Sequence, residues 1–74
     1  MTTFEHKLSV EEMCSAIGWN PTDLAREARI NYQTAKRAYD GQQPAQRTKR
    51  DICSAFSRGF NREVAITEIA WSVN

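Results

Sequence analysis

Apolar residues recur every three to four positions near the start of the chain. Four of them stand at i, i+3, i+4 and i+7, the spacing of one face of an amphipathic helix: Val10, Met13, Cys14 and Ile17. Ser9 and Glu12 form a capping box where this stretch begins, and Gly18 suits a left-handed cap where it ends. The pattern predicts a helix that begins after Ser9 and ends near Gly18.

Two shorter helices follow, and the faces they bury are rich in alanine. Asn20 caps the first, with Pro21 at the first helical position, and this helix ends near Ala28. Asn31 caps the second, which ends at residues 40–41. Its inward residues are Ala35, Ala38 and Tyr39. Small facing residues let two helices cross closely and steeply, so the pair is typical of a helix-turn-helix unit, with an ordinary helical hairpin as the alternative.

Two further helices are predicted in the remainder of the chain. The fourth runs from Gln46 to Arg58, with Gly59 as its stop. Its inward residues are Ile52, Cys53 and Phe56. The same helical spacing then returns in Ile66, Ile69, Ala70 and Val73. Residues 64–67 would also suit a strand, but the spacing favours a fifth helix. We therefore expect an all-α domain of five helices over residues 1–74, with a flexible arm at residues 1–7.

The length and composition fit one small domain. With 74 residues, of which 41% are hydrophobic, the core is small, and pairing of two chains is the expected extra source of stability. Cys14, Cys53 and His6 are too scattered for a structural zinc site. The two cysteines are expected to be buried as small hydrophobic residues, with a disulfide as the alternative. Neither a membrane-spanning run nor a secretory leader is visible, so we expect a cytoplasmic protein without metal, cofactor or membrane partner.

Charge is concentrated in the middle of the chain. The net charge is +1, but residues 26–50 carry seven Lys and Arg against two Asp and Glu, which is +5. The flanking residues 1–25 and 51–74 carry −3 and −1. This distribution indicates one cationic face, with a solvated helix surface as the alternative.

The order of residues from 21 to 41 resembles the helix-turn-helix of the lambda-repressor/Cro-like family (Cro/CI-type, often called XRE). The positions that carry the resemblance are Leu24-Ala25, Ile30, Asn31, Thr34-Ala35, Ala38, and Asp40-Gly41 followed by Pro44. Ile52 and Phe56 fall where the family's fourth helix places core residues, so the likeness spans about residues 8–60.

Three positions depart from the family pattern. Arg29 stands at the usual turn glycine, Pro21 at a usual phosphate-binding glutamine, and Lys49 at a usual apolar position. A positive φ at Arg29 would cost about 1 kcal/mol. The stem of Lys49 can lie over the core while its ammonium stays in water.

The resemblance implies that the helix beginning after Asn31 enters the major groove of DNA. Its outward residues, expected to contact bases, are Asn31, Tyr32, Gln33, Lys36 and Arg37. Glutamine can bond adenine, and arginine or lysine can bond guanine, each pair giving about 1–3 kcal/mol of discrimination. Phosphates are expected to bind mostly at helix N-termini and in the following loop, through Asn20, Thr22, Arg26, Gln42, Gln43, Arg47 and Thr48. Partial burial of Tyr32 and pairing of Arg26 with a nearby acid are the alternatives.

Members of the family usually pair about a two-fold axis, with their recognition helices about 34 Å apart. Residues 61–74 hold the apolar side chains expected to form the dimer contact: Ile66, Ile69, Trp71 and Val73. The alternative is that this segment covers the core of its own chain.

The sequence therefore predicts a sequence-specific regulator of transcription that binds double-stranded DNA. It would be a homodimeric repressor of phage, plasmid or mobile-element type, acting in the bacterial cytoplasm at the nucleoid. A protein-interaction module or an antitoxin-like partner on the same scaffold is the alternative. An enzyme is not expected, because neither a catalytic triad nor a glycine-rich phosphate loop can be assembled, and no small-molecule ligand is evident.

Overall fold

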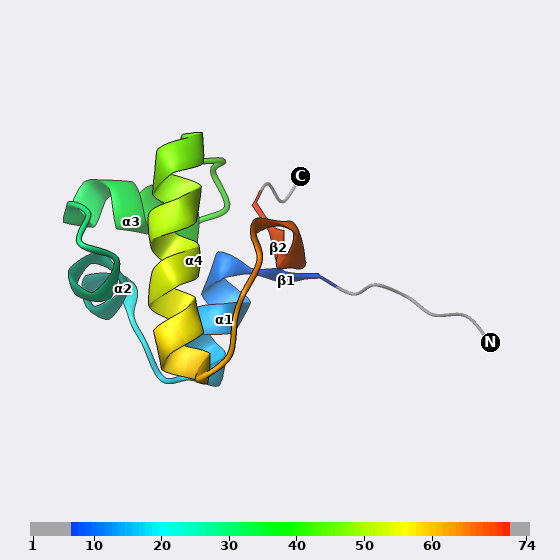
Figure 1. Ribbon diagram of the computed structural model, residues 1–74. Coiled ribbons are helices and arrows are strands. Elements are labelled where there is room, and N and C mark those ends of the chain that lie inside the picture. Colours follow the sequence, from blue (N-terminus) through cyan, green and yellow to red (C-terminus); the bar gives the residue numbers. More distant parts are fainter. Residues whose placement is uncertain (1–6, 72–74) are drawn as a thin grey trace.

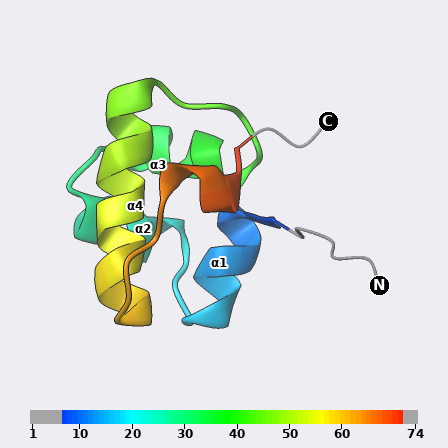
Figure 2. The same ribbon diagram turned by 45° about the vertical axis from the view of Figure 1, so that its right-hand side comes forward.

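The computed structural model describes residues 7–71, which form four helices, one 3-10 turn and a pair of very short strands (Figure 1). In chain order the elements are β1 Leu8–Ser9, α1 Val10–Ala16, α2 Pro21–Ala28, α3 Tyr32–Tyr39, α4 Gln46–Phe60, η1 Ile66–Glu68 and β2 Ile69–Ala70. α4 stands in the middle, with α2 and α3 on one side of it and α1 with the strands on the other (Figure 1). The C-terminal segment runs back along α4 toward the start of α1 (Figure 2).

The first three helices begin at the predicted caps. The Ser9 hydroxyl accepts from the Glu12 N–H at 3.1 Å, and the Glu12 carboxylate accepts from the Ser9 N–H at 2.9 Å. Asn20 and Asp23 form the same reciprocal pair at the start of α2, and the Asn31 amide oxygen caps α3. These short-range bonds satisfy N–H groups that a helix leaves open in its first turn.

A residue with positive φ follows each of the four helices, at one of two positions. α2 and α4 are capped directly by Arg29 and Asn61, with φ of 59° and 58°. After α1 and α3 the positive-φ residue comes one position beyond the cap, at Gly18 and Gly41, with φ of 73° and 99°. After α2, the Arg29 N–H donates to the Arg26 carbonyl at 3.3 Å and the Ile30 N–H donates to the Ala25 carbonyl at 3.0 Å. These are the two hydrogen bonds of a Schellman motif. Arg29 therefore has the positive φ considered above, a backbone conformation that favours glycine over arginine.

The core gathers apolar side chains from all four helices and from the C-terminal segment. Leu24, Ile52 and Phe56 are fully buried at its centre. Ala35 and Ala38 of α3 are also buried, which keeps the α2–α3 crossing close, as predicted. The prediction for the cysteines is confirmed, since Cys14 and Cys53 are both free and buried.

Gly59 does not stop α4, which continues to Phe60 and ends at Asn61. The glycine lies inside the helix where the α1–α2 connection packs against it. A Cβ at this position would meet Ile17 Cδ1 at 2.7 Å and Trp19 Cζ2 at 3.1 Å. The prediction was wrong because the sequence alone could not separate a glycine that ends a helix from one that makes room for a neighbour.

The predicted fifth helix is also wrong, and with it the all-α fold of five helices. Residues 63–65 are irregular, Ile66–Glu68 form a 3-10 turn, and Ile69–Ala70 form a strand parallel to β1. Leu8 lies opposite Ile69. Burial alternates between Ile69, which is buried, Ala70, which is half-buried, and Trp71, which is buried, so the segment follows the two-residue period of a strand.

The turn that replaces this helix is held by Glu68. Its carboxylate accepts from the Ala65 N–H at 3.1 Å and from the Arg62 guanidinium at 2.9 Å. These two donors hold the pKa of Glu68 below its usual value. Because Glu68 bonds backward to residue 65, the chain makes one tight turn and then extends.

Candidate nucleic-acid interface

The outer face of α3 is polar and open to solvent. Asn31, Tyr32, Gln33 and Arg37 are exposed, and Tyr32, at 49%, is the one large apolar side chain exposed within residues 7–71. Partial core burial of Tyr32 is therefore not observed. The orientation follows from Ala35 and Ala38, which face inward and turn the opposite side of this eight-residue helix outward.

Lys36 differs from the other predicted base contacts because it has a partner on its own helix. Its ammonium lies 2.9 Å from both carboxylate oxygens of Asp40. The hydrogen bond to Asp40 raises the pKa of Lys36. The i, i+4 spacing of the two residues was the available signal for this pair, and the sequence prediction missed it.

A hollow of about 300 Å³ lies between α3 and the beginning of α4. It is lined by Thr34, Arg37, Gln42, Gln43, Pro44, Ala45 and Thr48. The hollow thus brings one predicted base contact, Arg37, together with three predicted phosphate contacts. Thr34, Pro44 and Ala45 were not predicted; Thr34 could have been found, because it stands three positions before Arg37 on the same helix face.

The start of α4 borders this hollow and has no side-chain cap. Ala45 precedes the helix and cannot accept a hydrogen bond from its first turn. The open N–H groups of a first turn carry the positive end of the helix dipole. Arg47, exposed in the same turn, adds a full positive charge. This end of the molecule is therefore suited to an anion.

The remaining predicted phosphate contacts belong to α2 and do not line the hollow. Thr22 is exposed, whereas the Asn20 amide oxygen already accepts from the Asp23 N–H at 2.8 Å. Arg26 pairs with Asp23 at 2.7 Å, although its side chain remains 67% exposed. The alternative of an acid partner for Arg26 is the one observed.

The C-terminal residues predicted for a dimer contact mostly serve the core of their own chain. Ile69 and Trp71 are 2% and 8% exposed, and Ile66 is half-buried. The Trp71 indole N–H donates to the Ile66 carbonyl at 3.0 Å. Val73 lies outside the described residues. The burial of Ile69 and Trp71 favours the alternative, in which this segment covers the core of its own chain.

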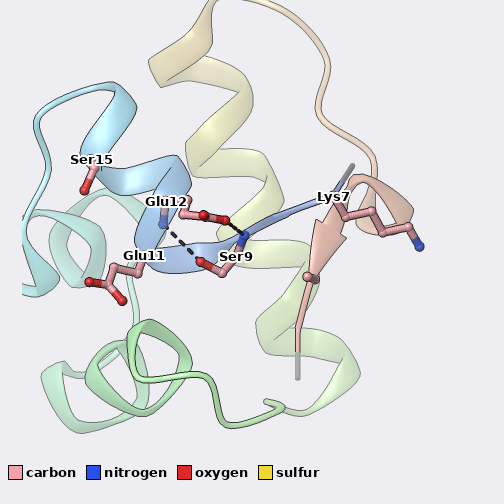
Figure 3. A pocket seen from close by; sticks show the side chains of 6 residues that line it. Lys7, Ser9, Glu11, Glu12 and Ser15 are labelled. Atoms are coloured by element: carbon pink, nitrogen blue, oxygen red, sulfur yellow. Dashed lines mark hydrogen bonds between the residues drawn. The ribbon is translucent and has the colours of Figure 1, made fainter. Parts of the chain in front are cut away.

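A second, larger hollow of about 510 Å³ lies beside β1 and α1 and is lined by Lys7, Ser9, Glu11, Glu12, Ser15 and Ala70. Figure 3 shows that its side chains do not converge: Lys7 and Glu11 point in different directions, while Ser9 and Glu12 bond to each other's backbone. Of the polar groups here, Ser9 and Glu12 therefore serve the cap of α1.

No protein-family model matches this chain, and neither a curated protein nor a solved structure matches it. Among residues 7–71, no helix is long and apolar enough to cross a membrane. The same residues contain no group of three or more His, Cys, Asp or Glu that could hold a metal ion.

Proposed function

We propose that this domain is a sequence-specific DNA-binding regulator of transcription that inserts α3 into the major groove. The observation that carries the proposal is the division of α3 into a buried alanine side and an exposed side with Gln33 and Arg37. Both exposed residues have side chains that can make two hydrogen bonds to one base edge. The resemblance to lambda-repressor/Cro-like proteins supports the same assignment.

Reading a base requires that the protein be held in register on the backbone. The hollow beside α3 supports this part of the proposal, because Gln42, Gln43 and Thr48 gather there next to the uncapped start of α4. Arg37 borders the same hollow. A phosphate held at this end of α4 would therefore position α3 along the groove.

A single unit of this size covers too little DNA for tight, specific binding. We therefore retain a homodimer on a two-fold operator, acting as a repressor of phage, plasmid or mobile-element type, as part of the proposal. Since Ile69 and Trp71 are buried in their own chain, we place the contact between copies on other residues.

The proposal is tested by selecting bound sequences from a random duplex pool and measuring binding to the selected site and to a scrambled duplex. Gln33→Ala is expected to weaken the selected site by about 5- to 150-fold, which corresponds to the 1–3 kcal/mol of one base-reading pair, and to leave the scrambled duplex nearly unchanged. Ser15→Ala, an exposed substitution on α1, is the matched control.

Equal losses on both duplexes would remove Gln33 from base reading. If the folded domain bound no duplex at about 50 mM salt, where phosphate contacts are strong, the proposed function would be refuted. A protein-interaction module would then be favoured.

A further inference from the structure

We propose that Lys49 is a positioning residue for the loop between α3 and α4: it holds the Gln43 amide with its NH₂ group turned toward the DNA backbone, and Trp71 holds Lys49. This inference rests on the proposed function and adds a residue to it. It also gives the buried C-terminal segment a part in DNA binding, in place of the dimer contact.

The ammonium group of Lys49 makes two contacts. Lys49 Nζ donates to Gln43 Oε1 at 2.8 Å, and it lies 5.7 Å from the centre of the Trp71 ring. A cation at this distance from an indole ring is attracted to its face. The ring is itself fixed, because Trp71 is buried and its N–H donates to the Ile66 carbonyl.

The chemistry of the ammonium decides which end of the amide faces outward. A lysine ammonium has three donors and no acceptor, so only the amide oxygen of Gln43 can face it. The NH₂ group, on the opposite branch of the same carbon, is left to meet other groups. A phosphate oxygen is only an acceptor, so this orientation of Gln43 matches a phosphate and the reverse orientation does not.

Gln43 lies where an outward NH₂ group could meet a phosphate. Its side chain is exposed and lines the hollow that Arg37 and Thr48 also line, beside the uncapped start of α4. A glutamine held in advance loses less side-chain freedom on binding than a free one, which favours affinity. Lys49 is half-buried, and its role explains why a cation stands at a position where the resemblance leads one to expect an apolar residue.

A double-mutant cycle on a duplex of random sequence at low salt tests the inference. Gln43→Ala is expected to weaken binding about 10- to 150-fold, the loss of one hydrogen bond to a charged group. Lys49→Met should weaken it at least as much in the wild-type background, but only about 2-fold when Gln43 is already alanine, because two residues that act as a unit are not additive. Lys49→Arg, which keeps the donor and the charge, should bind nearly as well as the wild type.

Lys49→Met is expected to fold, because methionine fills a volume similar to that of lysine and is apolar, like the residue expected at this position. Equal losses from Lys49→Met in both backgrounds would overturn the inference, since Lys49 would then act through its charge alone. A wild-type domain that binds no duplex would refute the proposed function as well. A wild type that binds, with additive losses, would refute only the role of Lys49.

A measurement without DNA tests the contact itself. In the ¹⁵N spectrum of the free protein, the side-chain NH₂ signals of Gln43, identified by their loss in Gln43→Ala, should move in Lys49→Met. Lys7→Met removes an exposed lysine that does not line the hollow beside Gln43 and should leave them in place. Unmoved Gln43 signals in Lys49→Met would overturn the inference even if DNA affinity fell.

Discussion

Replacing Arg29 by glycine is expected to stabilise the domain. Arg29 has φ of 59° and an exposed side chain. Left-handed backbone costs a residue with a side chain about 1–2 kcal/mol, whereas glycine gives the unfolded chain extra freedom worth about 0.4–1 kcal/mol. The expected net gain in the free energy of unfolding is about 0.5–1 kcal/mol. For a domain of this size, that gain raises Tm by about 2–8 °C.

Urea and thermal unfolding followed by circular dichroism measure this change, and two variants separate the backbone from the side chain. Arg29→Ala removes the same charge but keeps a Cβ, so it should not share the gain. Asn61→Gly changes a second left-handed residue with a side chain and should gain less, because asparagine tolerates this conformation better than arginine does. If Arg29→Gly were no more stable than Arg29→Ala, the assignment of backbone strain to Arg29 would be refuted.

Three further changes test the core. Gly59→Ala should destabilise the domain by about 1 kcal/mol, because crowding against Trp19 costs more than the gain in helix propensity; a rise in Tm would contradict this. Trp71→Ala should lower the free energy of unfolding by about 3–5 kcal/mol, measured by urea unfolding; an unchanged midpoint would place the ring outside the core. Burial raises the pKa of Cys14 from 9.0 to about 12 and of Cys53 from 9.0 to about 11. The folded state therefore keeps protons that the unfolded state loses, and Tm should fall above about pH 9; a flat profile between pH 9 and 11 would refute the cause.

The first three helices could be predicted because the signals for their starts are local. The caps at Ser9, Asn20 and Asn31 each bond to a residue three positions away, so a short stretch of sequence contains the whole interaction. The buried face of α3 follows from the helical period in the same way. The polar side of α3, which carries the candidate interface, was therefore predictable as well.

The C-terminal segment could not be predicted, because its conformation depends on distant partners. Ile69 pairs with Leu8, which lies near the other end of the chain, and a helical spacing of apolar residues does not exclude a strand. Lys49 is a similar case, since one of its two contacts is with Trp71, far along the chain. Its contact with Gln43 spans a turn whose shape the sequence does not define.

The parallel pairing of Leu8 with Ile69 brings the two ends of the described chain side by side, at about the spacing of hydrogen-bonded strands. The backbone thus nearly closes into a ring. Because the two strands are parallel, a linker that completes this ring must cross from the end of β2 back to the start of β1, which takes about a dozen residues. New termini could then be opened at an exposed turn such as Gly18 without breaking a helix. The domain is in this respect suited to circular permutation and to insertion as a unit into a loop of another protein.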